Sequence, residues 1–426
     1  MLHALYTLFV LILLLLTLPW WVIRSLRTGK YRGTMRQRLG FALPKPPVGA
    51  APIWIHAVSV GEVMAAQGLL RALHARYPDS PLLLSTVTKT GQEIARSLPG
   101  ISATFYLPLD LPWIVRRVLK HLQPRALIVM ETELWPNLFQ QCKLQQIPVI
   151  LVNGRLSPRS FRHYRLFRWA MKPFLEPVHL FIMQSAADAE RMLALGSDPQ
   201  RVIHSGNLKY DQALQPPTPA QLQELAERLP PPSGIIWLAA STHPGEEESI
   251  LDSLQSLRPQ WPTLRLILVP RHPERAATVG ALIRQTPFQY ALFSQLSAPW
   301  NEEILLVDQV GWLTRLYRYA HIAFVGGSLI PHGGQNMLEP ASQGIPTLFG
   351  PHTVNFRQAV QQLLEKQAAL QLPDRTALTP TVQQLLADPE LRQQLGTRAQ
   401  AVVASNSGAL QRTLQALQPL LDTPPL

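Results

Sequence analysis

Short apolar runs rich in β-branched residues alternate along most of this chain with segments whose apolar positions recur every three or four residues. Strand-like runs of the first half include IWIHAV, ALIVM and PVILV, and those of the second half include IIWLAA, LRLILV and IAFVGG. Buried strands that alternate with amphipathic helices are typical of βαβ units and parallel sheets. The pattern therefore predicts an α/β protein with two doubly wound, Rossmann-like domains.

The boundary between the two domains is predicted by composition. Residues 212–233 are rich in proline and polar residues and contain no strand-like run, which is typical of an interdomain linker. We expect one domain over residues 45–211 and the other over residues 234–426. Because ligands of doubly wound sheets bind beyond the carboxyl ends of the strands, we expect the functional residues in the loops after the strands, in a cleft between the domains.

The N-terminus departs from this alternation. Nineteen residues from Leu5 to Ile23 carry no charge, and as a helix at about 1.5 Å per residue they would span roughly 28 Å, close to the thickness of a bilayer core. Near the end of the run come Trp20 and Trp21, which suit the membrane interface. The cations that follow are Arg24, Arg27, Lys30, Arg32, Arg36 and Arg38. By the positive-inside rule they keep the rest of the chain in the cytoplasm, so we expect residues 1–24 to be an uncleaved membrane anchor.

This anchor has two alternative forms. The helix can lie in the membrane interface as a monotopic anchor. It can also be a cleaved signal peptide, but that would need charge before the apolar run and a small-residue cleavage site after it. Here the charge follows the run and no such site is present, so an uncleaved anchor is favoured.

Composition narrows the class of protein. With 46% hydrophobic and 15% charged residues over 426 positions, the chain can bury two domain-sized cores. Its single cysteine, Cys142, excludes an intramolecular disulfide and fits a reducing compartment. The net charge of +12 fits nucleic acid, an anionic membrane surface or an anionic substrate. No nucleic-acid-binding module accompanies it, so we expect no nucleic-acid partner.

Glu62 lies where the run IWIHAV ends and an amphipathic helix begins. The helix is predicted by apolar residues on one face, at Ala66, Leu69, Leu70, Leu73 and Tyr77. The carboxylate can simply complement the helix dipole, which is worth about 0.3–1 kcal/mol, and this role would lower its pKa. Gly61 allows a close backbone turn, however, and the strand end directs the loop toward the expected cleft. The residues alone leave a structural and a functional role open.

Two further loops of the first half carry charged pairs. Glu131 and Glu133 follow ALIVM and would point the same way on an extended segment, although they can also cap the helix expected after Pro136. Arg155 and Arg159 follow PVILV and form either a basic rim for phosphates or ordinary surface cations. A single helical stripe is predicted by arginines spaced by three, at Arg159, Arg162, Arg165 and Arg168.

The second half offers a set of groups suited to an anion. Arg271 follows LRLILV and supplies a planar donor fork for a phosphate or carboxylate, whereas a histidine such as His272 is more often structural. A glycine turn follows IAFV, and backbone N–H groups of a helix expected from Gln335 would favour an anionic ligand. Asn336 and Glu339 share a helical face toward that turn. No Asp-x-Asp motif for a metal-bridged diphosphate occurs, so we expect neither a metal nor another cofactor.

Taken together, the loop motifs resemble those of the 3-deoxy-D-manno-octulosonic acid (Kdo) transferases of lipopolysaccharide synthesis. In chain order they are HAVSVGE (56–62), ETELWP (131–136), NGRLSPR (153–159), STHPGEE (241–247), PRHPER (270–275), GGSL (326–329) and GQNMLEP (334–340). The resemblance extends from the N-terminal run through His352, and several motifs in matching order are more specific than one glycine-rich loop. It implies a membrane-anchored glycosyltransferase of the GT-B fold that transfers Kdo from CMP-Kdo to a lipid A precursor, with inversion at the anomeric carbon.

The same resemblance assigns roles to residues. Glu62 would be the general base that takes the proton from the acceptor hydroxyl, with Glu131 as a second catalytic residue. The donor would be bound by Arg271, His272, Gly326, Gly327, Ser328, Asn336 and Glu339. The acceptor would be bound by Glu133, Arg155 and Arg159. The expected location is the cell inner membrane, whose anionic lipids would be a further partner, with the catalytic domains in the cytoplasm.

Two other functions fit the sequence. One is a GT-B transferase that uses a UDP-sugar and a lipid-linked acceptor. The other is a non-catalytic, membrane-tethered binding protein on a GT-B scaffold. The presence of Glu62 in one half and of the Arg271, Asn336 and Glu339 set in the other argues against the last, because a scaffold without turnover does not need both.

Overall fold

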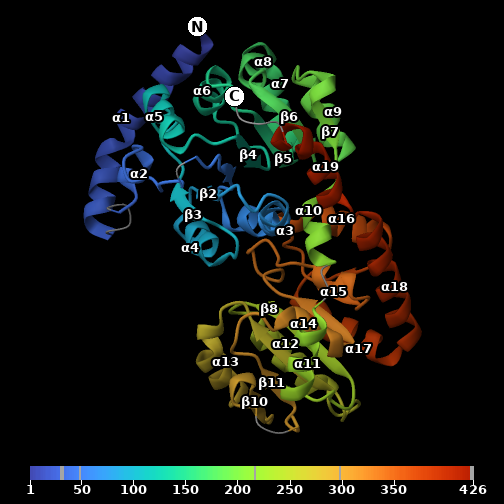
Figure 1. Ribbon diagram of the computed structural model, residues 1–426. Helices are drawn as coiled ribbons and strands as arrows, with labels where there is room; N and C mark the ends of the chain where they lie inside the picture. Colours follow the sequence, from blue (N-terminus) through green and yellow to red (C-terminus); the bar gives the residue numbers. More distant parts are fainter. Residues whose placement is uncertain (29–32, 48, 215–216, 297–298, 423–426) are drawn as a thin grey trace. The chain divides into compact units, whose positions relative to one another are not determined.

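The computed structural model describes residues 1–28, 33–47, 49–214, 217–296 and 299–422, with the backbone alone for residues 18–28. The chain forms two compact units, Met1–Gln212 with Ser407–Leu426, and Ala213–Asn406. Each unit is built on its own parallel sheet covered by helices (Figure 1). The expected α/β class with two doubly wound domains is confirmed.

The sheet of the first unit has the strand order β3-β2-β1-β4-β5-β6-β7 among the described residues, with parallel pairings throughout. Its strands are β1 (Ile53–His56), β2 (Leu82–Thr86), β3 (Ala103–Tyr106), β4 (Ala126–Met130), β5 (Val149–Gly154), β6 (Val178–Met183) and β7 (Val202–His204). The strand order reverses between β1 and β4. The crevice beyond the carboxyl ends of two such strands is where doubly wound sheets bind ligands, and the loops of Glu62 and Glu131 follow these two strands.

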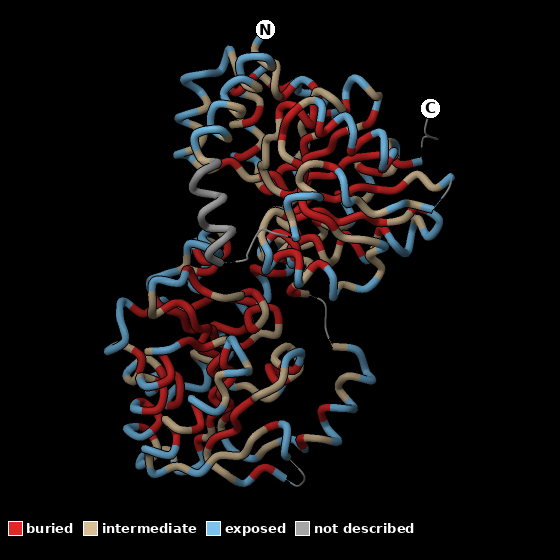
Figure 2. The backbone as a smooth tube through the Cα atoms, turned by 90° about the vertical axis from the view of Figure 1, so that its left-hand side faces the viewer, coloured by how far each residue is buried: buried red, intermediate tan, exposed pale blue. Residues whose placement is uncertain are grey.

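Alternate residues of β1 face two separate cores of the first unit. Trp54 contributes to a core that includes residues of α5, α6 and α8, whereas Ile53 and Ile55 belong to a core with residues of α3 and α19. Strands buried on both faces read as continuous apolar runs, which is why the sequence predicts them. The buried backbone at the centre of the unit is visible in Figure 2. The helices are α1 (Leu2–Thr28), α2 (Met35–Arg38), α3 (Val60–Arg76), α4 (Lys89–Ser97), α5 (Pro112–Leu122), α6 (Pro136–Leu144), α7 (Pro158–Leu166), α8 (Arg168–Leu175), α9 (Ala186–Ala194), α10 (Leu208–Ala213) and α19 (Ala409–Asp422).

The second unit repeats this plan with the strand order β10-β11-β9-β8-β12-β13-β14 among its described residues. Its strands are β8 (Ile236–Thr242), β9 (Arg265–Pro270), β10 (Tyr290–Leu292), β11 (Ile304–Leu306), β12 (Ile322–Val325), β13 (Thr347–Phe349) and β14 (Leu370–Gln371). Its helices are α11 (Pro219–Arg228), α12 (Glu247–Leu257), α13 (Ala276–Ile283), α14 (Leu313–Leu316), α15 (Leu338–Ser342), α16 (Arg357–Glu365), α17 (Leu378–Ala387) and α18 (Pro389–Ser405). The order reverses between β8 and β12, so the glycine turn after β12 lies at the second ligand-binding position of this architecture.

The compact units differ from the expected domain limits at three places. The first unit begins at Met1 and not at residue 45, and the other two differences lie at the linker and near the C-terminus. The expected linker contains α11, which begins with a capping box between Thr218 and Gln221 and buries Leu225 in the second unit. The expected domain 234–426 lacks its last segment, because α19 packs on α3 with Leu417 and Leu421 in the core of the first unit.

The returning segment is fixed where it enters the first unit. The carboxylate of Asp211, on α10, accepts from the N–H of Gly408 at 2.6 Å and from that of Leu410 at 2.8 Å. The guanidinium of Arg412 donates to the carbonyls of Ser205 and Ser407 at 2.7 and 3.0 Å. The segment that leaves the first unit and the segment that returns to it are therefore bonded to each other.

The N-terminal helix α1 is held against the first unit by its opening turns. The hydroxyl of Tyr6 donates to Asp110 at 2.9 Å, and that of Thr7 donates to Asn137 at 3.1 Å. No helix among the described residues is long and apolar enough to cross a membrane. The membrane-spanning anchor expected over residues 1–24 is thus not found in this part of the chain. Outside the described side chains lie Trp20, Trp21, Arg24, Arg27, Lys30 and Arg32.

Candidate active site

Glu62 occupies the first turn of α3 and is only 7% exposed. One carboxylate oxygen accepts from the N–H of Val58 at 2.8 Å, and the other accepts from the hydroxyl of Ser59 at 3.0 Å. Ser59 is the N-cap residue of the helix, so Glu62 reaches back to the residues that precede it, as the acid of a capping box does. The structural role considered for this residue is therefore present.

The electrostatic surroundings also suit Glu62 to proton transfer. Burial raises its pKa to about 7; the bonds from Val58 and Ser59 oppose this rise, and the charges of Glu131 and Glu133 add to it. The effect of the helix N-terminus, expected to lower the pKa, is outweighed by burial. A carboxylate with a pKa near neutrality is well matched to general base catalysis at physiological pH.

The acidic loop after β4 brings Glu131 and Glu133 into the field of Glu62. Glu131 has a φ of 57°, a left-handed conformation that is uncommon for a residue with a side chain, and its N–H donates to the carbonyl of Val152 at 2.8 Å. Burial and the charge of Glu131 raise the pKa of Glu133. Strained backbone positions of this kind cluster at functional sites. The carboxylates of Glu62, Glu131 and Glu133 thus interact electrostatically in the loops after β1 and β4, where the strand order of the first sheet reverses.

Thr132 joins this acidic loop to the loop after β5. Its hydroxyl accepts from the N–H of Arg155 at 2.7 Å and lies within bonding distance of the Arg155 carbonyl. Arg155 is half-buried beside the acidic loop, whereas Arg159 is exposed on α7. The structure brings Arg155 to the site and leaves Arg159 on the surface of a helix.

The single arginine stripe predicted from the spacing is interrupted. Helix α7 ends at Leu166 and α8 begins at Arg168, with Phe167 between them. Arg168 therefore belongs to a different helix from the other three arginines. The sequence gives regular spacing across this break, which is why the prediction of one stripe was wrong.

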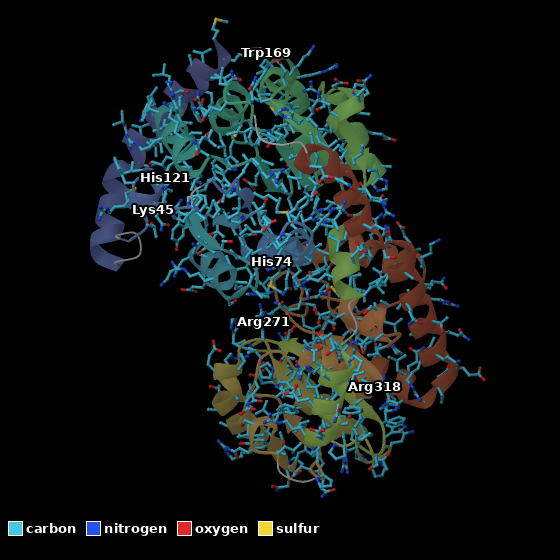
Figure 3. All side chains as sticks on the ribbon, in the orientation of Figure 1. Lys45, His74, His121, Trp169, Arg271 and Arg318 are labelled. Atoms are coloured by element: carbon cyan, nitrogen blue, oxygen red, sulfur yellow. The ribbon has the colours of Figure 1, made fainter. Side chains whose placement is uncertain are left out.

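In the second unit, three predicted donor-site residues share one electrostatic environment. Glu339 accepts from the side-chain amide of Asn336 at 2.9 Å. Burial raises the pKa of Glu339, while this bond and the positive charge of Arg271 lower it. The backbone N–H of Arg271 donates to Thr242 at 2.9 Å, and its side chain is exposed (Figure 3). His272 is also exposed, with its Nδ1 atom 3.5 Å from Glu274.

The glycine turn after β12 differs from expectation. The N–H groups of Gly327 and Ser328 donate to the carboxylate of Glu246 at 2.7 and 3.0 Å, so both already have an anionic partner within the chain. The N–H groups of Gly334 and Gln335 donate to backbone carbonyls of the same turn. The helix expected from Gln335 begins at Leu338 and has five residues. These four N–H groups therefore already donate to acceptors within the protein.

Sequence reasoning assigned no role to several residues of these loops. Glu246 and His243 lie in the motif STHPGEE, in which a strand end followed by consecutive acids was the available signal. The ring of His243 lies 4.2 Å from that of His332, and its Nε2 atom is 3.2 Å from the side-chain nitrogen of Gln335. Thr132 lies within the motif ETELWP, and nothing in the neighbouring sequence indicates its contacts with the backbone of Arg155. Among the described residues, no group of three or more histidine, cysteine, aspartate or glutamate side chains could hold a metal ion.

Comparison with known proteins gives a consistent family. A sequence model of the family described as 3-Deoxy-D-manno-octulosonic-acid transferase (kdotransferase) matches residues 33–212. The chain is 39% identical over 404 residues to a 3-deoxy-D-manno-octulosonic acid transferase of Haemophilus influenzae, covering 93% of this chain and 94% of that protein. It is 36% identical over 393 residues to the protein of the same name from Bordetella pertussis, covering 89% and 90%.

A solved structure supports the fold alone. The crystal structure of a glycosyltransferase from Rickettsia africae covers 88% of this chain and 100% of its own, with a TM-score of 0.53 and 13% sequence identity. At this identity the likeness shows that the two proteins share an architecture of two parallel-sheet α/β domains.

Proposed function

This chain belongs to the family of Kdo transferases and is a glycosyltransferase of lipopolysaccharide synthesis, and we propose that it moves Kdo from CMP-Kdo to a lipid A precursor with Glu62 as the general base. The acceptor binds the first unit and the nucleotide binds the second. The observation that carries the proposal is the buried Glu62 carboxylate, whose pKa is raised to about 7 beside two further acids.

The reaction requires one proton to move and one bond to be exchanged. Glu62 takes the proton of the acceptor hydroxyl as its oxygen attacks the anomeric carbon of Kdo. The bond from that carbon to the phosphate oxygen breaks, and CMP leaves with the bonding electron pair. A single displacement of this kind inverts the configuration. Glu131 orients the reacting groups from the neighbouring loop, and its strained backbone supports this assignment.

The donor is held by residues of the second unit. Glu339 and Asn336 are bonded to each other and form hydrogen bonds with the ribose hydroxyl groups. The guanidinium of Arg271 binds the phosphate or the Kdo carboxylate. His272 and the turn of Gly326, Gly327 and Ser328 complete the donor site. Because the N–H groups of Gly327 and Ser328 are bonded to Glu246, the turn acts by its shape.

The acceptor is a phosphorylated lipid, and the first unit offers groups of the opposite charge. Arg155 lies beside the acidic loop and Arg159 on the exposed face of α7. Glu133, in the acidic loop, contacts acceptor hydroxyl groups. A guanidinium binds phosphate in a bidentate manner, so these arginines orient the acceptor.

We propose that the protein associates with the cell inner membrane, and we assign this association to a surface of the first unit rather than to a spanning helix. Helix α1 presents apolar side chains that are more than half exposed, at Leu5, Leu8, Phe9, Leu15 and Leu16. On α6, α7 and α8 and between the last two, the exposed apolar residues are Leu144, Leu166, Phe167 and Trp169. Trp169 is labelled in Figure 3. Exposed cations of α7 and α8 are Arg159, Arg162, Arg165, Arg168 and Lys172.

An apolar helix face flanked by cations is typical of a helix that lies in the interface of a membrane with anionic lipids. The bonds from Tyr6 and Thr7 to the first unit support this orientation, because they fix one side of α1 against the protein. The catalytic units then remain on the cytoplasmic side.

The proposed reaction is tested with purified enzyme, CMP-Kdo and a tetra-acylated lipid A precursor, followed by mass spectrometry of the products. We expect the mass of the acceptor to increase by one or more Kdo residues and CMP to be released. Transfer from a UDP-sugar with none from CMP-Kdo would overturn the donor assignment. Binding of CMP-Kdo without turnover would instead indicate a non-catalytic scaffold.

A further inference from the structure

Glu246 is a buried acid of the second unit that the proposed mechanism does not use. It is the last residue before α12 and has no exposed surface. It forms no ion pair with any described residue, in contrast to Glu247 beside it, which pairs with Arg275 at 2.7 Å. A buried carboxylate without a cation is costly unless its oxygens are fully hydrogen-bonded.

Backbone N–H groups from two loops provide that compensation. One oxygen of Glu246 accepts from the N–H groups of His243 at 3.0 Å and Gly327 at 2.7 Å. The other accepts from Ser328 at 3.0 Å and Leu329 at 2.9 Å. His243 follows β8, and the other three follow β12. Glu246 therefore joins the loops of the two strands between which the order of the second sheet reverses.

The surrounding chain leaves little room for another arrangement. A side chain at Gly326 would place its Cβ 2.8 Å from a carboxylate oxygen of Glu246 and 2.6 Å from the carbonyl of Ser241. The hydroxyl of Ser328 accepts from the N–H of Gly350 at 2.9 Å, which joins the turn to the end of β13 as well. The turn is thus fixed by its hydrogen bonds to Glu246 and by the bond between Ser328 and Gly350.

This turn in turn holds the segment that carries the ribose-binding pair. The N–H of Gly334 donates to the carbonyl of Gly327 at 2.7 Å, and that of Gln335 donates to the carbonyl of Gly326 at 3.1 Å. Asn336 comes next in the chain and donates to Glu339. A continuous path of hydrogen bonds and chain therefore leads from Glu246 through the glycine turn to Asn336 and Glu339.

We propose that Glu246 is a positioning residue for the nucleotide-sugar donor, which holds the glycine turn in the one arrangement that presents Asn336 and Glu339 to the ribose. This inference rests on the proposed donor site and adds to it a residue that never touches the donor. Four N–H groups converge on two oxygens, and only an ionised carboxylate can accept from all of them. Glutamine can supply one oxygen and would place N–H groups against N–H groups.

The test compares Glu246→Gln with Glu247→Gln in the full-length protein. Both acids are fully buried neighbours, but Glu247 bonds to Thr242 and Arg275 and not to the turn. We expect Glu246→Gln to weaken CMP binding, and to raise the KM for CMP-Kdo, by about tenfold or more. The KM for the lipid acceptor should stay within twofold, roughly, of the wild-type value because that site is assigned to the other unit. Glu247→Gln should lower the melting temperature with a smaller effect on CMP affinity.

A second variant keeps the test informative if Glu246→Gln does not fold. Glu246→Asp keeps the charge but withdraws it by one methylene, so it should lose some of the four bonds and show a smaller rise in the CMP dissociation constant. If both variants melt earlier but bind CMP as the wild type does, Glu246 has only a structural role and the proposal is overturned. If the wild type binds UMP and not CMP, the donor assignment fails, and the role of Glu246 is then measured with UMP.

Discussion

The proposed role of Glu62 as a base and its place in the first turn of α3 have opposing electrostatic requirements. As the acid of the first turn of α3 it is stabilised in its charged form by the N–H of Val58 and by the helix dipole. As a base it must be able to take up a proton near neutral pH, and burial together with the charges of Glu131 and Glu133 makes this possible because they raise its pKa to about 7. The surroundings that would suit the residue to catalysis thus destabilise its ionised form.

Substitution of Glu62 by glutamine separates these roles. Glu62→Gln keeps an oxygen for the N–H of Val58 but cannot take a proton, so turnover should fall by roughly 10²–10⁴. The pKa of the carboxyl is raised in the folded protein, so its favourable contribution to stability is present at acid pH and lost as the pH rises through about 7. The melting temperature of the neutral variant at pH 8 should therefore not fall below that of the wild type. Near-normal transfer with a lower melting temperature would leave Glu62 as a helix cap alone.

The acid limb of the pH profile should report the same group. Below about pH 7 the kcat/KM for the acceptor should fall about tenfold per pH unit, because Glu62 becomes protonated. The charge of Glu133 raises the pKa of Glu62, so Glu133→Gln should move this limb to lower pH. Glu176→Gln, an exposed acid of the same unit, is the matched control and should leave the limb in place. A limb that does not move in Glu133→Gln would assign it to another group.

Other residues of the site could not be inferred from the sequence. Glu246 bonds to residues 81 to 83 positions away, and no pattern within one motif encodes a contact of that range. Thr132 is similar, because its partner Arg155 lies 23 positions further along the chain. Glu62 and Glu131 could be selected as candidates because each lies in the loop region that follows an apolar run, and strand ends of parallel sheets collect functional residues.

At the scale of elements, the strands were more predictable than the helix starts. Strands such as β1, β4 and β5 are buried along their whole length, so their sequences contain almost only apolar residues. The helix expected from Gln335 begins later because Gly334 and Gln335 bond back to the glycine turn, a tertiary contact that local periodicity does not reveal. Helix α11 was overlooked because its polar and proline-rich sequence buries a single leucine.

The exposed face of α1 gives a prediction at this scale. Phe9→Glu combined with Leu16→Glu should release the protein from vesicles that contain anionic phospholipid, measured by co-sedimentation, because both side chains are more than half exposed. CMP affinity should be unchanged, since the donor site is assigned to the other unit. Val310→Glu introduces the same kind of change at an exposed apolar residue of the second unit and should leave membrane binding intact. Unchanged sedimentation of the double variant would exclude this face as the membrane contact.

At the scale of the whole molecule, the C-terminal helix stabilises the unit in which the chain begins. Leu417 is almost fully buried against the core that includes α3, so Leu417→Ala should destabilise the first unit by about 2–5 kcal/mol. Differential scanning calorimetry with and without CMP assigns the transitions, because CMP should raise only that of the second unit. Gln415→Ala, on the exposed face of the same helix, is the control. A loss confined to the CMP-sensitive transition would contradict the assignment of α19 to the first unit.

The bonds between Asp211 and the start of α19 have a consequence for synthesis on the ribosome. The second unit is continuous in sequence and forms an insertion within the first, so the unit that is begun first is finished last. While residues 213–406 are being translated, the face of α3 that α19 will cover stays open to water. Exposed apolar surface of this kind is what chaperones recognise in incomplete chains. The nascent protein therefore depends most on chaperones after the second unit has left the ribosome and before α19 has been synthesised.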